Sequence, residues 1–75
     1  MKKYKNLSGK SAVAEYEVAK DSVTIGFKNC STYIYTNQSA GSGNISQMKI
    51  LALAGKGLST FIDANVKEAF SRKIR

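Results

Sequence analysis

The chain of 75 residues contains no histidine and a single cysteine, Cys30. One cysteine cannot form an internal disulfide, and without histidine the chain has no set of residues at zinc-site spacing. Histidine is also the most common general acid or base in enzymes. Of the five acidic residues, Glu15 and Glu17 alternate with apolar residues, which is typical of a solvated strand face. We therefore predict no catalytic residue, no metal, no cofactor and a protein that is not an enzyme.

Long apolar runs are missing too. No stretch approaches the roughly 20 apolar residues that a membrane-spanning helix requires. The N-terminal residues MKKYKNLSGK are basic but are not followed by the continuous apolar segment of a secretory signal. We predict a cytoplasmic protein without a membrane partner. Its length allows one domain, which we divide into a basic N-terminal segment (1–10) and a single folded domain (11–75).

Acidic residues are few, since twelve Lys and Arg stand against five Asp and Glu, for a net charge of +7. No charged residue occurs between positions 29 and 48. If the two termini meet in space, they form one positive patch that attracts polyanions. The alternative is that loose, solvated ends keep a small protein soluble. The basic residues at the termini are Lys2, Lys3, Lys5, Lys10, Arg72, Lys73 and Arg75.

Alternation of apolar and polar residues predicts three strands, SAVAEYEV (11–18), VTIGF (23–27) and STYIYT (31–36). The turns AKDS and KNCS between them are short, so the strands should form an antiparallel meander. In the first strand the apolar even positions should face the core, which leaves Val13 on the open face. The segment NQSAGSG (37–43) is predicted to be a loop.

Two helices should follow the sheet. The first is predicted to have Asn44 as its N-cap and to end at Gly55. The second is predicted over 58–73, LSTFIDANVKEAFSRK, where apolar residues recur at i, i+3 and i+4. The predicted fold class is α+β, a three-stranded antiparallel β-meander followed by two α-helices packed on one face. The other face would carry Val13 and Ile34 and could pair with a second copy.

Tyr33 and Tyr35 leave the same face of their strand, and the hairpin loop before them decides which face that is. With a two-residue loop (29–30) both rings are exposed and offer a stacking platform for bases. With a three-residue loop (29–31) Phe27 pairs with Tyr33, Ile25 pairs with Tyr35, and both rings enter the core. Each ring can bury about 150–250 Å². We therefore favour rings that pack in or at the edge of the core.

The order SAVAEYEV, VTIGF, YIY and LALAGKGLSTFI resembles the KTSC domain, a short module with a central YxY motif. Its members occur as bacterial and phage-associated proteins and at the C-terminus of some lysyl-tRNA synthetases, a context that suggests RNA binding. Two positions depart from the family: Cys30 replaces a glycine, and TNQSAGSGN replaces a valine–proline. The resemblance covers roughly residues 11–74, with the best matches at Tyr16, Phe27, Tyr33, Tyr35, Ala54, Gly57, Phe61 and Ile62.

The leading hypothesis is a non-enzymatic module that binds RNA or DNA, and no small-molecule substrate is expected. The alternative is a protein-interaction or self-association module of a prophage or bacterial protein, in which charge plays no part. Salt separates the two, because binding to phosphates weakens steeply with ionic strength. The candidate nucleic-acid contacts are Lys2, Lys3, Lys5, Lys28, Lys56, Arg72, Lys73, Tyr33 and Tyr35.

Overall fold

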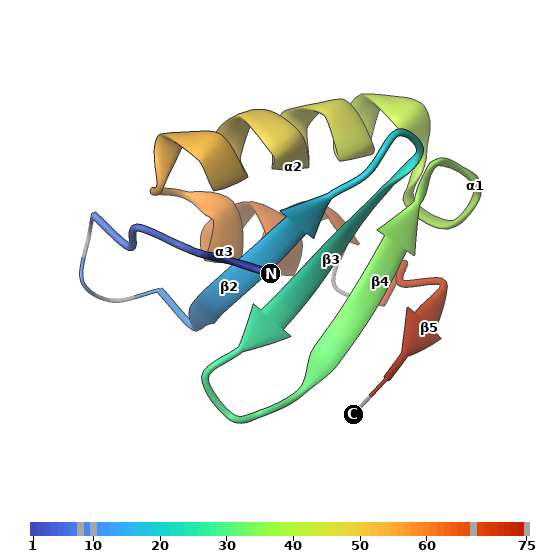
Figure 1. Cartoon of the computed structure of the whole chain (residues 1–75). Helices are drawn as coiled ribbons and strands as arrows, with labels where there is room; N and C mark the ends of the chain where they lie inside the picture. Colours follow the sequence, from blue (N-terminus) through green and yellow to red (C-terminus); the bar gives the residue numbers. More distant parts are fainter. Residues whose placement is uncertain (8, 10, 67, 75) are drawn as a thin grey trace.

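A computed structural model of the chain describes residues 1–7, 9, 11–66 and 68–74. The fold is α+β, an antiparallel sheet with its helices packed against one face, as the sequence predicts (Figure 1). The strands are β1 (Lys2–Lys3), β2 (Val13–Val18), β3 (Ser22–Phe27), β4 (Thr32–Thr36) and β5 (Arg72–Lys73), in that spatial order. The helices are α1 (Asn37–Ala40), α2 (Ser42–Ala54) and α3 (Leu58–Phe61), which continues into the π-helical turn η1 (Ile62–Val66).

The sheet has five strands, because both basic termini add an edge strand to the predicted meander. Lys2 pairs with Tyr16 on one edge, and Lys73 pairs with Tyr33 on the other. The prediction of a helix over 58–73 is therefore wrong beyond Val66. The backbone N–H of Ser71 donates to the carbonyl of Ile34 at 2.6 Å, so the chain satisfies the open edge of β4. Two-residue strands are too short to show alternation in a sequence.

The segment 37–43 is not a loop, because it forms α1 and the start of α2. Thr36 and Ser39 form a reciprocal capping box, in which each backbone N–H donates to the other residue's hydroxyl at 3.0–3.1 Å. Asn44 is not an N-cap: its side chain lies inside α2 and donates to the carbonyl of Ala40 at 2.8 Å. Gly55 ends α2 in the left-handed conformation with φ 82°, which confirms the predicted end of this helix.

A bulge in β2 overturns the predicted orientation of Val13. The pairing of β2 with β3 shifts by one residue between Val13 and Glu15. An extra residue in one strand reverses the alternation of side chains beyond it. Val13 is consequently 0% exposed in the core, together with Tyr16, whereas Val18 at the end of the strand is 40% exposed. A strict two-residue period cannot reveal such a bulge.

The hairpin between β3 and β4 buries the YxY tyrosines. Its loop spans residues 28–30, closed by a bond from the N–H of Phe27 to the carbonyl of Ser31 at 2.8 Å. The predicted choice of face is confirmed, since Tyr35 is 1% exposed and Tyr33 is half-buried. The predicted partners are wrong by two residues, because Ile25 pairs with Tyr33 and Val23 with Tyr35. Cys30 ends this loop with φ 71°, the conformation that three-residue hairpins require there.

Candidate functional site

The basic termini lie on opposite edges of the sheet. Three strands separate β1 from β5, and neighbouring strands are about 4.8 Å apart, so the two edges are roughly 19 Å apart. The condition for a single terminal patch is therefore not met. Lys10 and Arg75 lie outside the described residues.

Cross-strand partners show which face each terminal cation shares. Directly opposed residues have their side chains on the same face of a sheet. Lys2 pairs with the core residue Tyr16, so it lies on the helix side, whereas Lys3 pairs with exposed Glu15 on the open side. By the same rule Arg72 lies beside Ile34 on the open side, and Lys73 lies beside Tyr33 on the helix side.

The open face of the sheet is not a stacking platform for bases. All seven aromatic side chains of the chain belong to the core on the helix side or pack against it. A shallow recess on the open face is instead lined by aliphatic, hydroxyl and carboxylate side chains. They are Met1, Glu15, Glu17, Thr24, Thr32, Ile34 and Ile74.

The aromatic residues instead line a pocket on the helix side, which we call the tyrosine pocket. It has a volume of about 340 Å³ and lies between the β3–β4 hairpin end of the sheet and the α3–η1 helix (Figure 1). Aromatic rings form part of its wall, and an amide, a hydroxyl and a carboxylate provide its polar groups. The lining residues are Ala12, Phe27, Asn29, Tyr33, Tyr35, Ser59, Ile62 and Asp63.

The rings of the tyrosine pocket support one another. The edge of one ring meets the face of the other between Phe27 and Tyr33, with centroids 5.6 Å apart and an interplanar angle of 83°. Phe70 packs against Tyr33 with centroids 4.7 Å apart. The Nζ of Lys73 lies 5.6 Å from the centroid of the Tyr33 ring, within cation–π range. The C-terminal segment therefore holds Tyr33 in place and brings a positive charge to it.

The electrostatics of the pocket favour a neutral phenol at Tyr35. Burial raises the pKa of Tyr35 to about 12, and the nearby Tyr33 and the negative charge of Asp63 raise it further in the same direction. Tyr35 is therefore protonated at neutral pH and can donate a hydrogen bond. Asp63, when ionised, can only accept. The pocket thus combines a donor and an acceptor with aromatic walls, which suits a flat polar ring.

Further lysines lie close to this pocket. Lys28 is exposed and sits between Phe27 and Asn29, which both line it. Lys56 precedes the lining residue Ser59 by three positions, at the turn between α2 and α3. The side chain of Lys5 packs against Gly55 at the same turn: a Cβ added to Gly55 would lie 2.6 Å from the Cβ of Lys5.

The structure thus brings together only some of the predicted nucleic-acid contacts. Lys28, Tyr33, Tyr35 and Lys73 gather at the tyrosine pocket, and Lys5 and Lys56 meet at the α2–α3 turn. Lys2, Lys3 and Arg72 lie elsewhere. The sequence analysis missed Asn29, Ser59 and Asp63 as pocket residues, because no spacing pattern connects them to the YxY motif. Only the packing of α3 and η1 beneath the sheet does so.

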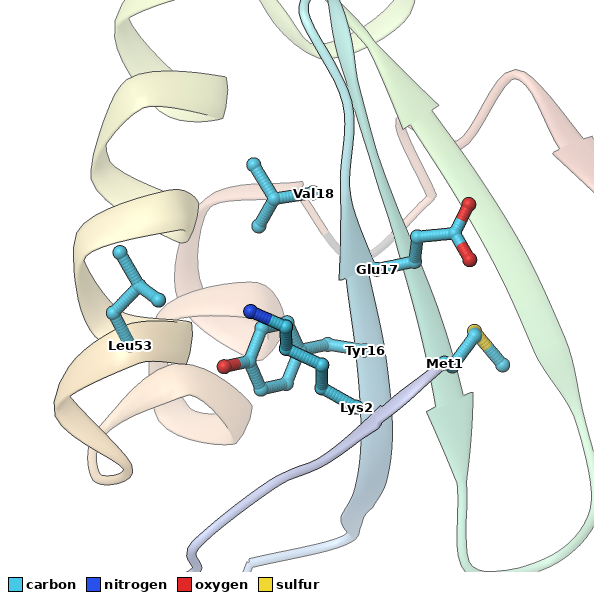
Figure 2. Close-up of a pocket in the computed structure, with 6 residues that line it drawn as sticks. All are labelled: Met1, Lys2, Tyr16, Glu17, Val18 and Leu53. Carbon is cyan, nitrogen blue, oxygen red and sulfur yellow. The ribbon is translucent and has the colours of Figure 1, made fainter.

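A second recess lies between β2 and α2 and has a volume of about 410 Å³. Figure 2 shows Val18 and Tyr16 of β2 facing Leu53 of α2, with Lys2 between them, while Glu17 and Met1 point to the other side of the strand. Leu53 is 59% exposed, so one wall of this recess is an apolar side chain in contact with solvent.

Comparison of the chain with protein-family models, curated proteins and solved structures gives no match. The resemblance to the KTSC domain therefore stays a prediction. Within the described part of the chain, no helix is long and apolar enough to span a membrane. The same residues contain no group of three or more His, Cys, Asp or Glu side chains that could hold a metal ion.

Proposed function

We propose that this protein is a non-enzymatic binding module for single-stranded nucleic acid. The tyrosine pocket takes one base, and Lys28 and Lys73 contact the adjoining phosphates. One observation carries the proposal: a pocket with aromatic walls and hydrogen-bonding groups lies next to two lysines.

Single-stranded nucleic acid fits the size and chemistry of the tyrosine pocket. Proteins recognise single strands by splaying out unstacked bases and packing them against aromatic side chains. Such a contact contributes about 1–3 kcal/mol per base. Phe27 and Tyr33 are only half-buried, so part of each ring remains accessible to a ligand. A base paired in a duplex cannot enter a recess of this kind without leaving its partner.

The distribution of charge supports the same ligand. The chain carries a net charge of +7, which attracts polyanions at long range. Lys5 and Lys56 at the α2–α3 turn provide a second pair of cations, close to the start of the helix that carries Ser59. A strand that leaves the pocket in this direction can place further phosphates beside them. Binding then needs neither Lys3 nor Arg72.

Fluorescence anisotropy with labelled single-stranded oligonucleotides tests the proposal. The double variant Lys28→Gln/Lys73→Gln should bind more weakly, and the slope of log affinity against log salt should fall by about 2, one for each lost phosphate contact. The matched control is Lys3→Gln/Arg72→Gln, which removes the same charge from the open face. Equal weakening by both pairs would assign the binding to net charge alone. No binding by the unmutated protein at low salt would end the proposal.

The open face favours a second candidate function, self-association through the sheet. Its recess includes Ile34 together with Met1 and Ile74, which are 50% and 52% exposed. Sedimentation velocity should then show a dimer that persists at high salt, because an apolar interface is not screened. Ile34→Lys should dissociate it. A monomer at every accessible concentration would rule this candidate out.

A further inference from the structure

The polar groups of the tyrosine pocket indicate which base it takes. We infer that the pocket selects guanine through the Asp63 carboxylate and the Tyr35 hydroxyl, an inference that rests on the proposed function. The two groups line the same pocket, Asp63 from η1 and Tyr35 from β4. They belong to elements far apart in the sequence and meet only because η1 packs under the sheet.

The hydrogen-bonding capacity of these two groups is one-sided. An ionised carboxylate presents two acceptor oxygens and no donor, and a protonated phenol can donate one hydrogen bond. Two acceptors side by side pair best with two parallel donors, as in carboxylate–guanidinium pairs. The pocket therefore calls for a ligand edge with two adjacent donors and an acceptor next to them.

Guanine presents this pattern on its Watson–Crick edge. Its N1–H and N2–H donors lie side by side, and the O6 acceptor is next to N1. Adenine and cytosine each place an acceptor next to their amino group, and uracil and thymine flank one N–H donor with two carbonyl oxygens. Those acceptors would face the Asp63 carboxylate and leave both groups unpaired. Asp63 therefore discriminates by what it rejects as well as by what it binds.

The position of Asp63 allows this role without a cost to the fold. Asp63 is exposed at the pocket, whereas its neighbours Ile62 and Val66 in η1 are buried in the core. The carboxylate is close enough to the Tyr35 hydroxyl to raise the pKa of that phenol. A ligand edge can therefore reach both groups at once. A variant at position 63 should change the pocket and leave the core intact.

The test is equilibrium binding to thymidine oligonucleotides that carry one central guanine, adenine, cytosine, thymine or hypoxanthine. A bidentate contact to a base discriminates by about 1–3 kcal/mol, which is roughly 5-fold to 150-fold in affinity. The guanine probe should bind more tightly than the other four by a factor in this range. Hypoxanthine lacks only the 2-amino group, so it isolates the second donor. A 7-deazaguanine probe keeps the Watson–Crick edge and should bind like guanine.

Asp63→Asn provides the matched variant, because it keeps the shape and replaces one acceptor by a donor. It should abolish the preference for guanine and retain binding to the thymidine oligonucleotide. Circular dichroism should show the same melting transition as the unmutated protein. Equal affinity for all five probes, or a guanine preference that survives Asp63→Asn, would overturn the inference and leave the proposed function standing. Failure of every probe to bind would overturn both.

Discussion

The contact between the N-terminal segment and the α2–α3 turn can be tested by replacing Gly55 with alanine. Gly55 has φ 82°, where a side chain costs about 1–2 kcal/mol. The added Cβ would also lie 2.6 Å from the Cβ of Lys5. This atom cannot swing away as the tip of a flexible side chain could, because it is attached to the backbone.

The backbone around Lys5 is held on both sides. Tyr4 is 2% exposed in the core, and the N–H of Leu7 donates to the carbonyl of Gly55 at 2.7 Å. Overpacking of this kind costs about 1–3 kcal/mol. With the backbone cost, we expect Gly55→Ala to lower the free energy of unfolding by roughly 2–5 kcal/mol. A domain of this length has only about 4–11 kcal/mol in total.

Two other glycines separate the backbone cost from the contact. Gly57 has φ 80° but meets only a side-chain carbon of Leu51 at 3.6 Å, so Gly57→Ala should cost about 1–2 kcal/mol. Gly43 lies inside α2 with nothing within 4 Å, so Gly43→Ala should stabilise the protein by about 0.5–1 kcal/mol.

Urea unfolding followed by circular dichroism measures all three variants under one set of conditions. Lys5→Gly removes the atom that Gly55→Ala would meet. The double variant should therefore recover about 1–3 kcal/mol relative to the sum of the single changes. If Gly55→Ala costs no more than Gly57→Ala, the N-terminal segment does not pack on this turn.

Three further predictions concern single residues. Val13→Ala should lower the free energy of unfolding by about 1–3 kcal/mol and Val18→Ala by much less, because Val13 is 0% exposed and Val18 is 40% exposed; equal losses in urea unfolding would contradict the bulge. The raised pKa of Tyr35, about 12 against 10.0 for a free phenol, favours the neutral form in the folded state. Its contribution to stability is thus complete below pH 10 and is lost as the pH rises towards 12, and Tyr35→Phe should remove this loss in unfolding measured across that range. Cys30→Gly should stabilise the protein by up to about 1 kcal/mol, because Cys30 has φ 71°; an unchanged melting temperature would argue against strain there.

The order of the main elements could be predicted from local patterns. Apolar alternation marked the three central strands, because a half-buried strand has a two-residue period. The burial of the YxY rings followed from apolar area, and Gly55 marked the end of α2 because few other residues adopt a positive φ. The charge asymmetry, with +7 overall and both termini basic, is likewise a property of the chain itself.

Only the tertiary structure decided how the ends of the chain are used. The two-residue strands β1 and β5 form because β2 and β4 present unpaired edges, and no local pattern encodes the need of a distant strand. The same pairing carries the basic termini to opposite edges and turns Phe70 and Lys73 towards Tyr33. Asp63 reaches the tyrosine pocket because η1 packs beneath the sheet, a long-range contact that the spacing of residues cannot express.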